Sequence, residues 1–263
     1  MASFISLSSY EIVLLRTLLG SLLLIAVFFL HQGKLTFFKY RKQFLYLVTS
    51  GIAMWASWIF LYEAYTRIGV SIASLLYYCG PVIVMILSPL LFKEKLTLSK
   101  VIGFLVVLCG VFLINGNALS NNGDMFGILC GLFSAVMYFL MVVFNKKAEP
   151  ISGLENSMLQ LFISFLTAAM FVGLKQGFVI QISFADILPI FILGLLNTGV
   201  GCYFYFSSIG DLPVQTVAIC GYLEPLSAVL FSVLILGERM LPLQILGAIL
   251  VLGGAIFGEC WKQ

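Results

Sequence analysis

The chain carries one pattern of residues twice, and the two copies lie 144 positions apart without a gap. The first copy is marked by Gly80-Pro81, Glu94-Lys95, Gly103 and Gly110, and the second by Glu224-Pro225, Glu238-Arg239, Gly247 and Gly254. A doubled module must fold in the same way twice, so any architecture for this chain has to contain two related halves. The pattern places these halves at residues 1–117 and 118–263.

Each half consists mainly of apolar runs. Hydrophobic residues make up 62% of the chain and charged residues 10%, whereas a soluble domain has roughly 25% charged residues. A helix that spans a bilayer needs about 20 apolar residues. Nine such segments can be outlined, at residues 10–32, 44–65, 69–92, 100–117, 124–144, 155–174, 187–207, 213–236 and 241–259. The runs are continuous rather than alternating, which predicts an all-α polytopic membrane protein.

Basic residues orient the predicted helices. They follow the first, third and fifth segments, as Lys34, Lys39, Arg41, Lys42, Lys93, Lys95, Lys100, Lys146 and Lys147. With alternating helices these loops and the C-terminus share one face, which the positive-inside rule assigns to the cytoplasm. The basic loop 34–43 corresponds in the second copy to 178–187, which contains no lysine or arginine. Equivalent loops thus lie on opposite faces, and the repeat is predicted to be inverted.

The register of the repeat leaves one helix without a counterpart. Segment 124–144 would map to positions before Met1, so the first half has four predicted helices and the second has five. We expect a native protein of ten helices, of which this chain lacks the first. A truncated membrane protein that does not transport is therefore one alternative for the function of the chain.

Both copies resemble a known module. The run Tyr78-x-x-Pro81, Glu94-Lys95-Leu96, Ile102-Gly103 and Gly110-Val111 resembles the EamA-type module of the drug/metabolite transporter superfamily, as does Tyr222-Leu223-Glu224-Pro225 with Gly237-Glu238-Arg239 and Gly247. Leu14-Leu15-Arg16 is similar to the arginine-bearing start of that family's second helix. The resemblance implies ten helices with both termini cytoplasmic and a central cavity lined by the first four helices of each repeat. It implies transport but does not indicate the substrate.

Glu224 is the ionisable residue predicted to lie nearest the bilayer midplane. It lies about eleven residues into its segment, or roughly 16 Å deep at 1.5 Å per residue. Charges at such depth are costly and usually functional, so we interpret Glu224 as a group that binds substrate or a coupled proton. The alternative is a protonated carboxyl group that hydrogen-bonds backbone groups left unpaired by Pro225. Pro81 and Pro225 are predicted helix hinges, with simple packing kinks as the alternative.

Six further residues are candidates for contact with substrate, and each has a structural alternative. Tyr78 and Tyr222 could present hydroxyl groups or pack as aromatics. Trp55 and Trp58 lie inside a predicted helix rather than at its edge, which favours cavity lining. Asn197 lies at mid-depth, where it could bind substrate or a neighbouring helix. Arg16 could contact substrate or extend its charge toward the outer surface. 

Several classes of function are disfavoured. The chain has no Gly-x-x-x-x-Gly-Lys-Ser/Thr loop for ATP and no Cys-x-x-Cys pair, and its one histidine, His31, lies at a helix end. We therefore expect no metal and no cofactor, and an intramembrane enzyme is the weakest alternative. A net charge of +3 without a basic patch argues against nucleic acid. The leading prediction is a secondary transporter of small metabolites in the cytoplasmic membrane, most simply an exporter working by alternating access. Its partners would be a small-molecule substrate, the lipid bilayer and, as an open alternative, a second copy in a homodimer.

Overall fold

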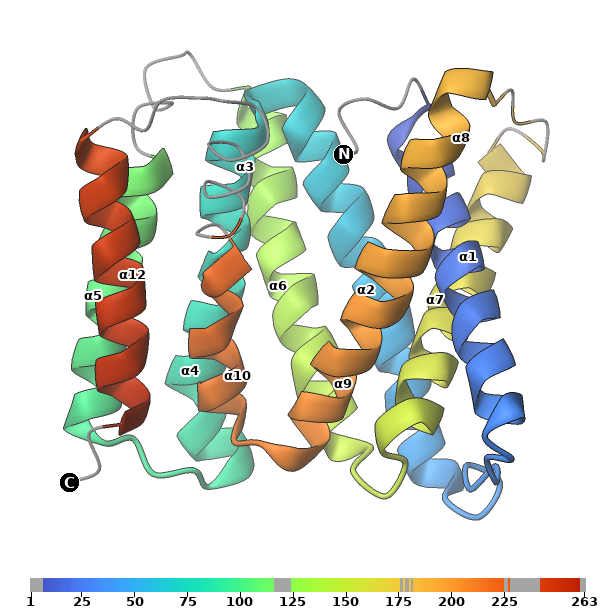
Figure 1. The fold of residues 1–263 in the computed structure, drawn as a ribbon, viewed down its shortest axis with the longest axis horizontal. Coiled ribbons are helices and arrows are strands. Elements are labelled where there is room, and N and C mark those ends of the chain that lie inside the picture. Colours follow the sequence, from blue (N-terminus) through green and yellow to red (C-terminus); the bar gives the residue numbers. More distant parts are fainter. Residues whose placement is uncertain are drawn as a thin grey trace. The chain divides into compact units, whose positions relative to one another are not determined.

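The computed structural model describes residues 7–115, 124–175, 177, 180, 182–224, 227 and 242–260. These residues form helices joined by turns, with no strand among them (Figure 1). In chain order the elements are α1 (Ser9–Leu30), α2 (Arg41–Ile68), α3 (Val70–Tyr77), α4 (Cys79–Phe92), α5 (Leu98–Asn115), α6 (Met125–Lys147), α7 (Gly153–Lys175), α8 (Phe184–Phe191), the π-helix η3 (Ile192–Val200), α9 (Gly201–Asp211), α10 (Val214–Gly221) and α12 (Pro242–Cys260). The all-α prediction is confirmed.

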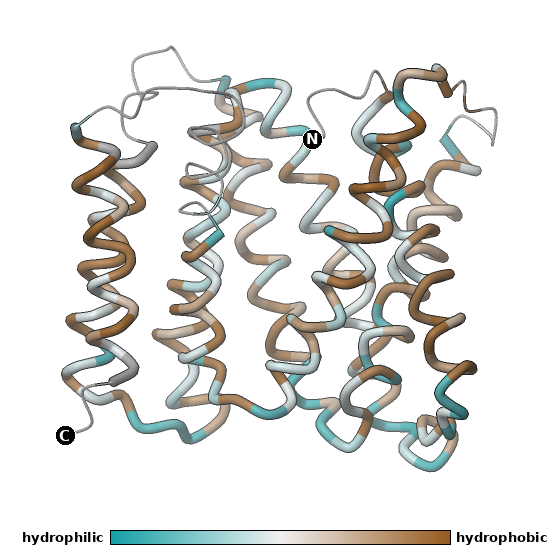
Figure 2. Tube along the Cα trace, in the orientation of Figure 1, coloured by the Kyte–Doolittle hydropathy of each residue, from teal (hydrophilic) through white to brown (hydrophobic). Residues whose placement is uncertain are grey.

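The helices have the length and composition of membrane spans. Among the described residues, six stretches are long and apolar enough to cross a bilayer, namely Ser9–Leu30, Arg41–Ile68, Ile72–Phe92, Met125–Lys147, Gly153–Lys175 and Phe184–Asp211, and two shorter apolar helices cover Leu98–Leu113 and Ile245–Gly258. Apolar residues run along the helices, and polar residues gather mainly at their ends (Figure 2). The chain is therefore a polytopic membrane protein, as predicted. Part of the predicted segment 213–236, including the predicted hinge Pro225, lies outside the described residues.

Helix boundaries repeat at the same spacing as the residue pattern. α1 begins at Ser9 and α7 begins 144 residues later, at Gly153. α3 and α10 have the same limits after this shift, and α5 and α12 have the same start. The continuous run of α8, η3 and α9 corresponds in the same way to α2. The two copies thus share their helix limits as well as their marker residues.

Contacts divide the chain into two compact units, each built from both copies. Unit 1 consists of residues 1–62 and 140–211, and unit 2 of residues 63–139 and 212–263. In unit 1, α1 packs against α7, and in unit 2, α5 packs against α12. The two helices of each pair run in opposite directions (Figure 1). Since the partners are repeat equivalents, each unit joins a helix to its own inverted copy, and the predicted inverted repeat is confirmed.

Glycines bring α5 and α12 into backbone contact. A Cβ atom added to Gly103 would lie 2.6 Å from the carbonyl oxygen of Gly254, and one added to Gly254 would lie 2.6 Å from that of Gly103. A Cβ atom on Gly110 would likewise lie 2.6 Å from the carbonyl oxygen of Gly247. Gly247 and Gly254 are the repeat equivalents of Gly103 and Gly110, so the two contacts exchange under the inversion. Small residues of this kind allow the close helix approach that stabilises helix pairs in lipid.

Two glutamates bind backbone N–H groups of the segments that connect helices within the units. In unit 1, the buried carboxylate of Glu155, at the start of α7, accepts hydrogen bonds from the backbone N–H groups of Thr36 at 2.6 Å and Phe37 at 2.9 Å, and from the Thr36 hydroxyl at 2.6 Å. It thereby anchors the basic turn that follows α1. In unit 2, the Glu94 carboxylate accepts a hydrogen bond from the backbone N–H of Val214 at 2.8 Å and caps the first turn of α10.

The glycine contact predicts different effects for two neighbouring substitutions. Gly254→Ala places a methyl group against the backbone of α5 and should lower the free energy of unfolding by about 1–3 kcal/mol. Gly253→Ala is the matched control, because a Cβ atom there meets no other atom within 4 Å. Reversible unfolding of the purified chain in detergent would measure both, and equal losses for the two variants would contradict the proposed contact.

The Glu155 anchor predicts protection of the basic turn from proteolysis. Glu155→Ala removes three hydrogen bonds to a charged acceptor, so trypsin cleavage after Lys34 and Lys39 should become about 10-fold faster or more. The exposed Glu149, in the turn before α7, supplies the control variant Glu149→Ala. Mass spectrometry of the fragments would give the rates. Cleavage at the wild-type rate in Glu155→Ala would show that the carboxylate does not hold the turn.

Candidate functional site

Arg16 lies in the second turn of α1, about 10 Å along the helix from its first residue. Its guanidinium stacks on the indole of Trp58 in α2, 3.9 Å from the ring centroid. Nε donates a hydrogen bond to Oγ1 of Thr198 at 2.8 Å, and Nη1 donates to the hydroxyl of Tyr62 at 3.1 Å. These four residues, which we call the Arg16 cluster, come from α1, α2 and η3, and all belong to unit 1.

The positive charge of Arg16 is not paired within the described part of the chain. The ion pairs found there join Arg67 to Glu63 and Asp124. Arg67 holds the pKa of the Asp124 carboxyl below its usual value, because the hydrogen bond favours the charged form. Arg16, which is half-buried, has no such carboxylate. A charge in a membrane span costs at least about 2.5–3.5 kcal/mol and usually marks a functional position.

A π-helix shapes one side of the Arg16 cluster. Within η3, the hydroxyl of Thr198 donates a hydrogen bond to the carbonyl oxygen of Leu193, five residues earlier, at 2.8 Å. Because its proton is committed in this way, the hydroxyl offers a lone pair to Nε of Arg16. The equivalent stretch of α2, residues 48–56, is regular α-helix. Helix irregularities of this kind occur frequently at functional sites.

Small residues hold α1 close to η3. A Cβ atom on Gly20 would lie 3.1 Å from Cγ2 of Thr198 and 3.2 Å from the backbone nitrogen of Gly199. A Cβ atom on Gly194 would lie 2.7 Å from Cβ of Leu19. The two helices therefore meet almost backbone to backbone beside Arg16, and the position of Thr198 relative to α1 is closely defined.

The inverted counterpart of the cluster is neutral and buried. The repeat equivalents of Arg16 and Thr198 are Gln160 and Met54, and these two residues also meet: Nε2 of Gln160 lies 3.9 Å from Sδ of Met54. Both are fully buried, and Gln160 also donates a hydrogen bond to Oγ of Ser50 at 2.9 Å. The fold thus builds the same contact twice but places a charge in only one of the two copies.

Other predicted site residues of unit 1 lie beside the cluster or apart from it. Trp55 packs with its ring centroid 5.2 Å from that of Phe171. Its buried indole N–H has no acceptor among the described residues. Asn197 precedes Thr198 in η3 and is exposed, so its amide group is available to a ligand. Of the two tryptophans predicted to line a cavity, Trp58 stacks on Arg16 and Trp55 packs on Phe171.

Tyr78 and Tyr222, which are repeat equivalents, pack against each other in unit 2. Their ring centroids lie 5.8 Å apart, and the Tyr222 hydroxyl donates a hydrogen bond to the Tyr78 carbonyl oxygen at 2.6 Å. Tyr222 is fully buried. Each tyrosine interrupts its span, since Tyr78 separates α3 from α4 and Tyr222 ends α10. In this conformation the Tyr222 hydroxyl takes part in packing, which is the alternative that the sequence left open.

Gly80 and Glu224 differ in their surroundings although they are repeat equivalents. A Cβ atom on Gly80 would lie 2.7 Å from the ring of Tyr138 and 3.0 Å from the carbonyl oxygen of Ala135, both in α6. No side chain fits there. Glu224 is exposed on its helix and stays a candidate for binding a proton or substrate.

The predicted hinge Pro81 lies inside a helix rather than at a break. It is the third residue of α4, where a missing backbone N–H removes no hydrogen bond within the helix. The break itself falls three residues earlier, at Tyr78. A bend at this point would occur at Tyr78. Pro81 would then favour the start of the helix that follows.

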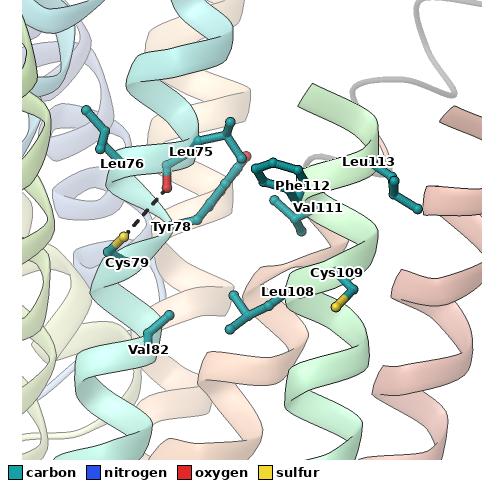
Figure 3. Close-up of a pocket in the computed structure, with 10 residues that line it drawn as sticks. All are labelled: Leu75, Leu76, Tyr78, Cys79, Val82, Leu108, Cys109, Val111, Phe112 and Leu113. Atoms are coloured by element: carbon teal, nitrogen blue, oxygen red, sulfur yellow. Dashed lines mark hydrogen bonds between the residues drawn. The ribbon is translucent and has the colours of Figure 1, made fainter. Parts of the chain in front are cut away.

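Unit 2 also contains an apolar pocket of about 600 Å³ between α3, α4 and α5 (Figure 3). Tyr78, Cys79 and Val82 line one side, and Cys109 and Phe112 are among the residues on the other. The Cys79 thiol is turned toward the carbonyl oxygen of Leu75, at 3.8 Å. The described residues that line this pocket carry no charge, so they suit an apolar group and offer little to orient a polar metabolite. The Arg16 cluster is the better candidate for a solute site.

Comparison with known proteins agrees with this architecture. The sequence model of the EamA-like transporter family matches twice, over residues 2–116 and 122–257. The chain belongs to the EamA-like transporter family. The resemblance read from the tyrosine, proline and glycine pattern is thereby confirmed, and the family together with its relatives supports a transporter of small molecules rather than an enzyme.

Two relatives and one solved structure illustrate how far this EamA-like chain resembles known proteins. A Helicobacter pylori protein is 30% identical over 262 residues, which cover 93% of this chain and 83% of the relative. A Bacillus subtilis protein, named YxxF, is 25% identical over 259 residues, which cover 95% of this chain and 80% of the relative. Both are named uncharacterized transporters. A crystal structure shares the fold with a TM-score of 0.82 at 17% identity, covering 96% of this chain and 89% of the other.

Sequence reasoning identified Arg16 and Trp58 separately and missed Tyr62 as their partner. Tyr62 lies four residues after Trp58, a spacing that puts both side chains on one face of α2. That spacing could have predicted that Tyr62 lies beside Trp58. The bond from Arg16 to Thr198 had no comparable signal, because it depends on the π-helix and on the close approach of α1.

The unpaired charge of Arg16 predicts that its removal stabilises the fold. Arg16→Gln supplies the residue found at the inverted counterpart, so it should raise the free energy of unfolding in lipid bicelles by about 1–3 kcal/mol. Arg67→Gln is the control, because it breaks two ion pairs and should leave stability unchanged or lower it. Equal destabilisation by both substitutions would show that Arg16 is a structural residue.

Proposed function

We propose that this EamA-like chain is a secondary transporter that exports small metabolites across the cytoplasmic membrane by alternating access. The observation that carries the proposal is the pairing of a helix with its own inverted copy in each unit, α1 with α7 and α5 with α12. Two inverted copies of one module can exchange conformations, so that a site faces first one side of the membrane and then the other. The outward direction is part of the proposal, since the family and its relatives are described only as transporters.

The proposed cycle assigns separate tasks to the two units. The Arg16 cluster in unit 1 would bind the solute. Glu224, exposed near mid-span, would bind the solute or exchange a proton for it, since a carboxyl group in a membrane span can change its protonation state as its surroundings change. The helix breaks at Tyr78 and Tyr222 support bending at these points. Pro81 and Pro225 follow each break by three residues and would complete the proposed hinges.

Contacts within each unit support a cytoplasmic position for the basic loops and the C-terminus. In unit 1, Lys146 donates a hydrogen bond to the carbonyl oxygen of Ile209 at 2.9 Å, at the end of α9. The start of α7 also contacts the basic turn after α1 through Glu155, so two basic clusters share one end of this unit. In unit 2, a Cβ atom on Gly258 would lie 3.9 Å from Cα of Lys100. The end of α12 therefore lies beside a third basic segment, as the positive-inside rule requires.

Reconstituted protein would test transport and its coupling. Proteoliposomes loaded with a mixed metabolite extract should release specific solutes that protein-free vesicles retain, as measured by mass spectrometry. If Glu224 exchanges a proton for the solute, release should accelerate as the external pH is lowered, and Glu224→Gln should lose this pH dependence.

A matched carboxylate separates this effect from a general loss of charge. Glu149→Gln, in the exposed turn between α6 and α7, should keep the wild-type pH dependence. Release with unchanged pH dependence in Glu224→Gln would remove Glu224 from the coupling step. Absence of any protein-dependent release would count against the transporter proposal as a whole.

A further inference from the structure

We propose that the solute carried by this chain is an organic anion, and that its carboxylate or other oxyanion group binds the guanidinium of Arg16. The inference rests on the proposed function, because it names the class of solute that the same protein would move. Three observations support it: the N–H groups that Arg16 leaves unused, its unpaired charge, and the neutral state of its inverted counterpart.

The guanidinium of Arg16 has more N–H groups than its described partners accept from. It has five N–H groups, and its described partners accept from Nε and from Nη1, one bond each. Both N–H groups of Nη2 therefore have no acceptor in the part of the chain that the structure describes. The indole of Trp58 covers one face of the guanidinium, and the unused N–H groups lie in its plane, at the edge. A planar edge with unused N–H groups matches two oxygen atoms of a carboxylate or phosphate.

The charge balance points to the same class of ligand. Thr198 and Tyr62 present neutral oxygen atoms and Trp58 a neutral ring, so the cluster orients the guanidinium without neutralising it. A positive charge in the low dielectric of a membrane span attracts an anion far more strongly than the same charge does in water. A neutral solute would leave the charge uncompensated, and a cationic solute would be repelled. An anion alone both fills the unused N–H groups and balances the charge.

The inverted counterpart shows that the fold does not require an arginine in this place. Gln160 and Met54 occupy the equivalent positions with no net charge and full burial. If Arg16 only held helices together, the neutral pair would serve equally well in unit 1. The arginine is instead half-buried, with its charge within reach of a ligand, and it is held in place by a hydroxyl group that a π-helix orients.

One exposed polar residue is next to the cluster in the chain. Asn197 is adjacent to Thr198 in η3 and is exposed, and its amide group can donate to a second oxygen of a ligand. The combination of a guanidinium, an amide and an aromatic ring favours a small organic acid over an inorganic ion, because the ring gives apolar surface to the carbon skeleton.

Flux measurements with solutes of defined charge would test the proposal. Proteoliposomes containing the full chain would be loaded with pyruvate, malate and inorganic phosphate as anions, pyruvamide and ribose as neutral solutes, and choline as a cation. Protein-dependent efflux should be confined to anions, and pyruvamide should not compete with them. In Arg16→Gln the anion concentration for half-maximal efflux should rise about 10- to 100-fold, as expected for loss of charged hydrogen bonds.

Further variants separate recognition of the anion from correct folding. Arg16→Lys keeps the charge but loses the planar edge, so its half-maximal concentration should fall between wild type and Arg16→Gln. Arg67→Gln, which removes a paired surface arginine, should stay within about 2-fold of wild type. Circular dichroism and thermal unfolding in detergent would verify that each variant is folded.

The outcomes distinguish this inference from the proposed function. Efflux of neutral or cationic solutes only, or anion efflux with an unchanged half-maximal concentration in Arg16→Gln, would overturn the assignment of an anionic solute while leaving a transporter. Failure of every solute to move, in this panel and in the mixed extract, would count against transport itself.

Discussion

Lipid removes the usual reason for helices to associate, because a hydrocarbon tail solvates an apolar side chain as well as another helix does. Contact between helices in a membrane then depends on close approach and on shape. In this chain such a close approach joins α5 and α12, where Gly103 and Gly110 exchange backbone contacts with Gly254 and Gly247. The two helices are antiparallel copies of one helix. Gly103 therefore meets the repeat equivalent of Gly110, and Gly110 meets the repeat equivalent of Gly103. Duplication with inversion therefore supplies a helix with a complementary partner of its own sequence.

The same symmetry makes departures from it informative. A residue pair that serves only packing can be alike in both copies, as the glycines of α5 and α12 are. Arg16 with Thr198 has become Gln160 with Met54 in the inverted position, and the helix that carries Thr198 is a π-helix where its counterpart is regular. Gly80 is likewise replaced by Glu224. A symmetric scaffold with a few charged exceptions matches the needs of a carrier, in which two similar halves move around one site.

Much of this architecture could be predicted from the sequence because it follows from properties that repeat. Apolar length fixes the spans, basic loops predict their direction, and the constant offset predicts which helices are equivalent. The limits of α3 and α10 follow the same offset, although the sequence predicted each only as part of a longer span. Arg16 and Trp58 were found as single residues because polar and aromatic groups stand out in an apolar helix. These are local signals, and a single sequence contains them.

The rest depends on distances between helices that the sequence does not record. The bond from Arg16 to Thr198 arises because Gly20 lets α1 approach η3 and because a π-helix turns Thr198 toward it. No periodic pattern marks that irregularity. For the same reason the sequence does not show that the hydroxyl of Tyr222 donates a hydrogen bond to the Tyr78 backbone. Pairing in three dimensions decides whether a polar group is already satisfied.

An unpaired arginine also bears on the direction of transport. In the proposed cycle the empty carrier has a positive charge at Arg16, and an anionic solute neutralises it. The loaded site then crosses the membrane field without net charge, while the empty site moves as a cation. A membrane potential acts on each moved charge with about 2.3 kcal/mol per 100 mV. With the cell interior negative, the potential draws the empty, positively charged site inward, where it can bind the next anion. Export of an anion therefore agrees in sign with the electrical force that acts on the charge of Arg16.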